Sequence, residues 1–293
     1  MTETVVRVNG VELCIDTIGD PADPPVLLIA GAASSMDAWD PEFCARLARG
    51  DRPGDRSGAH SGGRYVIRYD HRDTGRSVSY PPGAPGYSGP DLVADAAGVI
   101  EARAGGRAHV VGVSMGGGIA QVLAVKEPER VASLTLIATS PGPGPNSGLP
   151  PVTDRMRAVF ENPPPEPDWT DPEAVVEYLV ADERPYAGPG SFDEARVRAA
   201  ARRTVERTAN PRSPANHWHV GGGEDTRPHL GGVKAPTLVI HGTADPLFPP
   251  AHGRALAEEI PGAELLLLEG VGHQVPPPST WETVIPAILR HTR

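Results

Sequence analysis

Runs of consecutive apolar residues alternate with amphipathic segments along most of the chain. Residues 26–30 and 265–268 are wholly apolar, which is typical of strands that are covered on both faces of a parallel sheet. Between such runs, residues 90–104 place apolar side chains at helical spacing. The alternation predicts an α/β fold with a mostly parallel, doubly wound, eight-stranded sheet. Further strands are expected at Tyr65–Tyr69, 110–113, 134–138 and 237–241, and further helices at Pro41–Arg49, 119–127, 252–260 and from 280 onward.

The chain opens with a predicted β-hairpin. Residues 5–8 and 11–17 have strand character and flank Asn9-Gly10, a dipeptide that favours the left-handed backbone of a two-residue hairpin turn. We therefore expect an antiparallel pair ahead of the parallel strands.

The pattern changes between residues 141 and 229. Helical segments are predicted at 152–160, Pro172–Glu183 and 192–208, and no apolar strand-like run occurs among them. A segment of this kind inside an alternating β/α chain is interpreted as a helical cap that sits on the main sheet. The expected division is a core domain of residues 1–140 and 230–293 and a cap subdomain of residues 141–229.

Composition limits the classes of partner. The 293 residues carry 27 Lys and Arg against 37 Asp and Glu, and this net charge of −10 disfavours nucleic acid and anionic membranes as partners. No apolar run approaches the ~20 residues of a membrane-spanning helix, and the first residues lack the features of a signal peptide. We expect a cytoplasmic monomer or homodimer. Cys14 and Cys44 are expected to be reduced, with a single disulfide as the alternative.

A catalytic motif lies where a predicted strand meets a predicted helix. Residues 112–116, Gly-Val-Ser-Met-Gly, follow the apolar run 110–113 and precede the helical pattern of 119–127. In a nucleophile elbow the serine stands on a tight, strained turn, so glycine is needed two residues away on either side. The helix that starts there also directs its positive end at the serine oxygen. The motif predicts Ser114 as a nucleophile; the alternative is a strand–helix turn with an inert serine.

A serine hydroxyl needs a general base, and the base needs a carboxylate that orients it. In this architecture such groups gather at the carboxyl ends of the strands, in the chain order serine, acid, histidine. Asp245 follows the predicted strand 237–241, and His273 follows the strand 265–268, so both satisfy order and position. The strand after the elbow ends in residues 136–140 without a carboxylate, which favours Asp245 as the acid.

The oxyanion of the tetrahedral intermediate needs backbone amides as donors. One amide should come from Met115, the residue after the nucleophile. The other should come from the small-residue loop after residues 26–30, where Ala32 is the best candidate and Gly31 permits its orientation.

Other polar residues have structural interpretations. Residues 70–77, Asp-His-Arg-Asp-Thr-Gly-Arg-Ser, invite a catalytic hypothesis, but a hydrogen-bonded loop with Gly75 at a special φ is favoured. His241, at a strand end, is interpreted as buried structure, and Glu269 as a residue that supports the site. Residues 50–63 are polar and predict a mobile surface loop. No His/Cys/Asp cluster has metal-ligand spacing, so we expect no metal.

Five segments of the chain match a known pattern: residues 19–24 (GDPADP), 69–77 (YDHRDTGRS), 110–116 (VVGVSMG), 236–240 (PTLVI) and 291–293 (HTR). With them the chain resembles the aclacinomycin methylesterase group of α/β hydrolases over nearly its full length, strongly around the sheet and weakly in the cap. The resemblance implies Ser114, Asp245 and His273 as a triad and Ala32 and Met115 as oxyanion donors. It also implies ester cleavage without a cofactor; the namesake removes a methyl ester from a polyketide.

We therefore expect a cofactor-free serine esterase that forms an acyl-enzyme on Ser114. Its partner should be a small-molecule ester, for which the resemblance suggests a methyl ester of a bulky or polyketide-like molecule. Lactonase, C–C hydrolase and haloperoxidase- or perhydrolase-like activities use the same triad and stay open, as does a non-catalytic receptor on the same scaffold. The candidate pocket walls are Met36, Trp39, Trp169, Phe192, His217, Trp218, Leu247 and Phe248.

Overall fold

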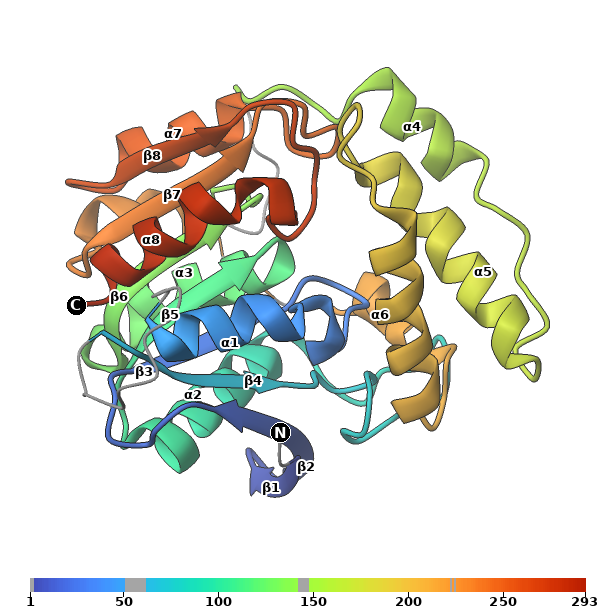
Figure 1. Ribbon diagram of the computed structural model, residues 1–293, viewed down its shortest axis with the longest axis horizontal. Helices are drawn as coiled ribbons and strands as arrows, with labels where there is room; N and C mark the ends of the chain where they lie inside the picture. The colour runs from blue at the N-terminus through green and yellow to red at the C-terminus, as the bar shows by residue number, and fades with distance from the viewer. Residues whose placement is uncertain (1–2, 51–61, 142–147, 222, 224) are drawn as a thin grey trace.

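A mixed β-sheet forms the centre of the structure, a computed structural model that describes residues 3–50, 62–141, 148–221, 223 and 225–293 (Figure 1). Its strands within these ranges are β1 (Thr4–Val8), β2 (Val11–Ile18), β3 (Pro25–Ile29), β4 (Tyr65–Tyr69), β5 (Ala108–Val113), β6 (Val131–Ile137), β7 (Thr237–Gly242) and β8 (Glu264–Leu268). They follow the order β1-β2-β4-β3-β5-β6-β7-β8. The strand β2 pairs antiparallel with both of its neighbours, and all other pairs are parallel. The predicted fold class is confirmed.

The opening hairpin forms as predicted. Val8 pairs with Val11 across Asn9 and Gly10, whose φ angles are 44° and 78°. Asn and Gly tolerate these left-handed angles better than other residues, so the dipeptide fixes the register of the pair.

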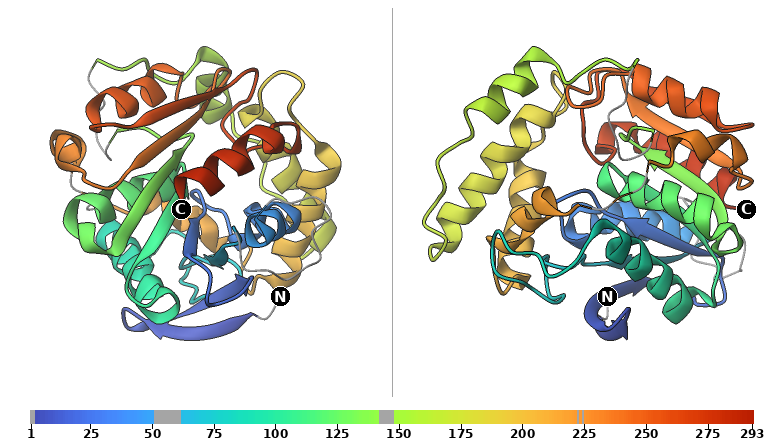
Figure 2. Two further views of the ribbon diagram at one scale, coloured as in Figure 1. Left: turned by 60° about the vertical axis from the view of Figure 1, so that its left-hand side comes forward. Right: turned by 180° about the vertical axis from the view of Figure 1, so that it is seen from behind.

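Helices cover both faces of the sheet. They are α1 (Pro41–Arg49), α2 (Gly89–Ala104), α3 (Met115–Lys126), α7 (Ala251–Glu259) and α8 (Trp281–His291). Successive side chains of a strand point to opposite faces, so Leu27 packs in the cluster that includes α2, α3 and α7, whereas Leu28 packs in the cluster that includes α1 and α8. Figure 1 shows α1 and α8 in front of the sheet, and the view from behind in Figure 2 shows the other helices.

The helix after the elbow begins earlier than predicted. The periodic pattern indicated residues 119–127, but α3 begins at Met115, immediately after Ser114. Residues 116–118 are all glycine and carry no apolar side chain that could register in the pattern. The early start brings the helix N-terminus directly to the serine.

Between β6 and β7 the described chain is helical. It contains α4 (Asp154–Glu161), α5 (Pro172–Glu183) and α6 (Glu194–Arg207), with the short segments η3 (Arg184–Tyr186), η4 (Ser213–His219) and η5 (Arg227–Gly232). We call this part the helical insertion. An apolar cluster that includes Val176, Val180 and Ala201 joins α5 to α6. Figure 1 shows α4, α5 and α6 beyond one end of the sheet.

Two expectations fall partly on residues outside the described ranges. Residues 51–61 cover most of the predicted mobile loop, and residues 142–147 lie next to the predicted start of the cap, so both stay predictions. Of the helices in the described ranges, none combines the length and the apolar character needed to cross a bilayer.

A buried ion pair joins the turn after β4 to α2. Arg72 donates from Nε and Nη2 to the two carboxylate oxygens of Asp95, at 2.7 and 2.8 Å, and both side chains are almost fully buried. Such bidentate pairs combine charge with two aligned hydrogen bonds.

We predict that Asp95→Ala lowers the free energy of unfolding by about 3–5 kcal/mol, because it leaves the Arg72 charge buried without a partner. Denaturant unfolding measures the change. The matched control is Glu101→Ala on the same helix, which removes an exposed ion pair to Arg130 and should cost about 0–1 kcal/mol. Equal losses in the two variants would contradict the prediction.

Candidate active site

Ser114 stands on a strained turn between β5 and α3. Its φ and ψ are 53° and −119°, a region that side chains rarely adopt. A Cβ on Gly112 would lie 2.2 Å from the carbonyl oxygen of Gly116, and a Cβ on Gly116 would lie 2.4 Å from the carbonyl oxygen of Ile29. Both glycines of the motif are therefore required by the close approach of backbone to backbone.

The structure brings the three predicted triad residues together. The Nε2 atom of His273 lies 2.9 Å from Ser114 Oγ, and its Nδ1 atom lies 2.9 Å from Asp245 Oδ2. A carboxylate accepts, so Nδ1 carries the proton and Nε2 is free to accept from the serine hydroxyl. This is the hydrogen-bond chain that removes a proton from a serine nucleophile.

Asp245 is held by backbone amides as well as by the imidazole. Its Oδ1 atom accepts from the amides of Leu247 and Phe248 at 2.9 and 2.8 Å. Nearby, His241 is buried, and its Nε2 lies 2.8 Å from the carbonyl oxygen of Phe248, to which it donates. Burial lowers the pKa of His241, so this ring is a neutral structural group, which agrees with its predicted interpretation.

The loop that carries His273 packs against the helical insertion. The backbone amide of His273 donates to the carbonyl oxygen of Tyr186 at 2.8 Å. A Cβ on Gly272 would lie 2.2 Å from the same oxygen, so the approach requires glycine. The insertion therefore positions the histidine.

The predicted oxyanion donors lie on the two segments that flank Ser114. Gly31 lies against it, since a Cβ there would be 3.5 Å from the Cβ of Ser114, and Ala32 lines the pocket beside the serine. Met115 is the first residue of α3, where backbone amides have no intrahelical acceptor. Both segments therefore place amides near the serine.

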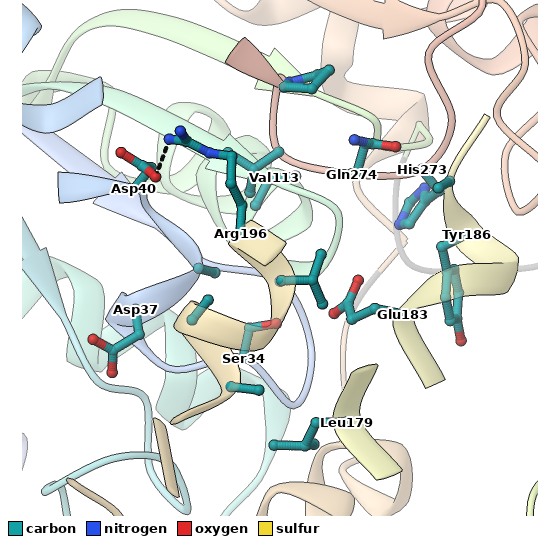
Figure 3. Close-up of a pocket in the computed structure, with 18 of the residues that line it drawn as sticks. Ser34, Asp37, Asp40, Val113, Leu179, Glu183, Tyr186, Arg196, His273 and Gln274 are labelled. Carbon is teal, nitrogen blue, oxygen red and sulfur yellow. Dashed lines mark hydrogen bonds and ion pairs between the residues drawn. The ribbon is translucent and has the colours of Figure 1, made fainter. Parts of the chain in front are cut away.

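A pocket of about 340 Å³ lies beside Ser114 and His273, within the usual range of about 300–1,000 Å³ for small-molecule sites. It is lined by residues of the loops after the strands and of α5 and α6 (Figure 3). Of the expected wall residues, Phe192, Trp218 and Leu247 line it. Trp218 is 63% exposed, at the edge of the pocket.

The remaining expected wall residues lie outside the pocket. Met36 and Trp39 are buried in the core, and Trp169 packs against another aromatic ring of the insertion. Phe248 packs edge-on against the imidazole of His273, with ring centroids 5.3 Å apart. His217 is hydrogen-bonded to the loop after β3. Position in a loop predicted proximity for these residues, but it did not predict the direction of each side chain.

Several polar pocket residues were not predicted. Arg196 forms an ion pair with Asp40, whereas Glu183 points into the pocket from the end of α5, close to His273 (Figure 3). Desolvation by the surrounding chain, together with the neighbouring Asp182, raises the pKa of Glu183 to about 7, although the residue as a whole is exposed to solvent. The helix that carries Glu183 was predicted with correct bounds, but no sequence signal indicated that its end would line the pocket.

The charged turn after β4 anchors the insertion. Arg207, the last residue of α6, donates from Nη2 to Asp70 Oδ2 at 2.6 Å, and Asp70 is fully buried. Gly75 has a φ of 50°, and a Cβ there would lie 2.1 Å from the Asp70 carboxylate. The favoured structural interpretation of residues 70–77 is thus confirmed.

Both cysteines are free and buried, so the alternative of a disulfide was wrong. Burial raises the pKa of each thiol, Cys14 and Cys44, to about 12, so both are protonated at neutral pH. Within the described ranges, no group of three or more His, Cys, Asp or Glu side chains is placed to hold a metal ion.

Comparison with known proteins identifies the family. The family model of the alpha/beta hydrolase fold matches residues 24–276. The chain belongs to this family. The rhodomycin D methylesterases of Streptomyces sp. (strain C5) and Streptomyces peucetius are each 34% identical to it over 312 residues, covering 100% of this chain and 99% of theirs. The predicted resemblance to methylesterases is confirmed. The solved esterase RhEst1 from Rhodococcus sp. ECU1013 shares the fold, with a TM-score of 0.75, 23% identity and 99% coverage of both chains.

We predict that Glu183 makes the protein less stable as the pH rises. Its folded-state pKa of about 7 lies above the ordinary value of 4.5, so the folded protein binds this proton more tightly than the unfolded chain does. Stability should therefore fall between about pH 4.5 and pH 7. Glu183→Gln should remove this loss and stabilise the protein at pH 8 but not at pH 4, as measured by denaturant unfolding. The effect should be smaller than for a fully enclosed carboxyl, because Glu183 is exposed to solvent, which screens its charge.

The matched control is Glu177→Gln, on the same helix. Glu177 pairs with Arg198, and this hydrogen bond lowers its pKa, so its removal should not stabilise the protein at pH 8. Identical unfolding curves for the wild type and Glu183→Gln at pH 8 would refute the prediction.

Proposed function

We propose that the protein is a cofactor-free serine hydrolase of carboxylic esters, with Ser114, His273 and Asp245 as its catalytic triad. The observation that supports this most directly is the hydrogen-bond chain from Ser114 Oγ through the imidazole to Asp245, with 2.9 Å at each step. The serine opens onto a pocket large enough for a small molecule. A binding protein would have no need of this strained and oriented arrangement.

The geometry supports a two-step reaction. His273 Nε2 takes the proton of Ser114 as Oγ attacks the ester carbonyl, and Asp245 stabilises the imidazolium. The amides of Ala32 and Met115 donate to the oxyanion. The intermediate then collapses, the leaving alcohol takes the proton from His273, and an acyl group stays on Ser114. A water molecule, activated by the same imidazole, attacks this acyl-enzyme and releases the acid.

For the substrate we propose a methyl ester of a bulky small molecule. The support is the identity of 34% with two rhodomycin D methylesterases over the full chain. Phe192, Leu247 and Trp218 give the pocket apolar and aromatic walls, and the exposed ring of Trp218 offers a flat surface at its edge. A cytoplasmic location, proposed from the sequence, agrees with the two free thiols.

We predict that Ser114→Ala lowers kcat for methyl and p-nitrophenyl esters by about 10⁴-fold or more, since loss of the nucleophile leaves only the residual catalysis of the oxyanion site and binding. A fluorophosphonate should label the wild type and should not label this variant. The control is Ser133→Ala in β6, whose hydroxyl bonds to His109 at 2.8 Å in the core; it should keep both activity and labelling.

Full ester hydrolysis by Ser114→Ala would refute the proposed function. A wild type that binds esters tightly, yet neither labels nor turns them over, would support the receptor hypothesis instead. A panel of methyl esters and lactones of graded size, assayed with the same pair of proteins, then decides between esterase and lactonase activity.

A further inference from the structure

His217 is a buried histidine of the insertion with both ring nitrogens engaged by the core. It lies in η4, and its Nδ1 accepts from the backbone amide of Ala33 at 2.8 Å. Its Nε2 lies 2.9 Å from the carbonyl oxygen of Arg72, to which it donates. An amide can only donate and a carbonyl can only accept, so these two partners fix the proton on Nε2. Burial lowers the pKa of His217, which keeps the ring neutral and Nδ1 free to accept.

Ala33 is held in a conformation that alanine does not favour. Its φ is 58°, and it lies inside a turn in which the amide of Ser34 donates to the carbonyl oxygen of Gly31 at 3.3 Å. A positive φ at this place in a turn usually requires glycine, because a Cβ crowds the backbone. The hydrogen bond from the Ala33 amide to His217 opposes relaxation of this peptide. Ala32, the proposed oxyanion donor, is the preceding residue of the same turn.

The segment that carries His217 is itself fixed to the core. Ser213 Oγ donates to the carbonyl oxygen of Asp73 at 2.9 Å, and Asn216 Nδ2 donates to the carboxylate of the same residue at 2.9 Å. The amide of Gly83 donates to Asn216 Oδ1 at 2.6 Å. These bonds give His217 a rigid base, as a residue that orients a catalytic loop requires.

We propose that His217 is a positioning residue for the oxyanion hole. Its Nδ1 accepts from the amide of the peptide that joins Ala32 to Ala33, and this bond fixes the turn. The turn then holds the preceding amide, that of Ala32, in place to donate to the oxyanion that forms on the carbonyl oxygen. The helical insertion then contributes to the chemical step and not to substrate selection alone. The inference rests on the proposed esterase function and adds to it a residue that does not line the pocket.

A matched pair of substitutions separates the hydrogen bond to Ala33 from simple packing. The carbonyl oxygen of an Asn side chain can take the place of Nδ1 as an acceptor, whereas the longer Gln side chain brings its amide to the place of Nε2. We expect His217→Gln and His217→Ala to lower kcat about 10- to 100-fold, part of the loss typical for removal of a whole oxyanion donor. The KM should change less than about threefold, and His217→Asn should keep most of the activity.

A second measurement reports on the oxyanion hole directly. In a trifluoromethyl ketone analogue of the substrate, Ser114 Oγ adds to the carbonyl carbon, its proton passes to His273, and the carbonyl oxygen becomes the oxyanion. Its inhibition constant should weaken in His217→Gln by the same factor as kcat/KM, because both depend on the same donors. His217→Asn should bind the ketone nearly as tightly as the wild type does.

The structural control is Thr292→Val, directly after α8. It removes the hydroxyl that accepts a buried hydrogen bond of 2.7 Å from Arg64 Nε. It should lower the melting temperature but leave kcat and ketone affinity unchanged.

Wild-type kcat in a folded His217→Gln, or equal losses in the Asn and Gln variants, would overturn the positioning role. If His217→Ala does not fold, the Asn and Gln pair still decides. An esterase that needs Ser114 but tolerates every His217 substitution refutes the positioning role alone. Activity that survives Ser114→Ala refutes the proposed function itself.

Discussion

The strained backbone of Ser114 is the constraint on which the rest of the site depends. The residue is held at a positive φ by hydrogen bonds on both sides: its amide donates to the carbonyl oxygen of Ile137 at 3.0 Å, and Thr139 Oγ1 donates to its carbonyl oxygen at 2.9 Å. Those partners belong to β6 and to the segment that follows it, so the neighbouring strand keeps the turn from relaxing. Gly112 and Gly116 then allow β5, β3 and α3 to pack with their backbones in direct contact. This packing brings the loops after the strands next to the serine.

The helical insertion completes this arrangement from the other side. The carbonyl oxygen of Tyr186 accepts a hydrogen bond from the amide of His273, and His217 accepts one from the amide of Ala33. Arg207 forms an ion pair with Asp70, in the turn after β4. Each contact is a polar bond to a group that is buried or partly buried, where an unmade bond is costly. The insertion is therefore hydrogen-bonded both to the loop that carries His273 and to the loop that carries Ala33.

Charge is distributed unevenly over the pocket. Arg196 forms an ion pair with Asp40, whereas desolvation and the neighbouring Asp182 raise the pKa of Glu183. A carboxyl with a raised pKa close to His273 is the kind of perturbed group that clusters at functional sites.

The sequence by itself determined the local elements and the order of the candidate catalytic groups. Strand and helix patterns depend on neighbouring residues, so the sheet and most helix bounds could be predicted. The glycines of the elbow reflect a backbone constraint, and together with the chain order they indicated Ser114, Asp245 and His273. Only the tertiary structure decided which side chains face the pocket. Trp39 is buried in the core, whereas Glu183 lines the pocket from the end of α5, far beyond Ser114 in the chain. Side-chain direction and the placement of the insertion arise from packing between segments distant in sequence, which no local pattern records.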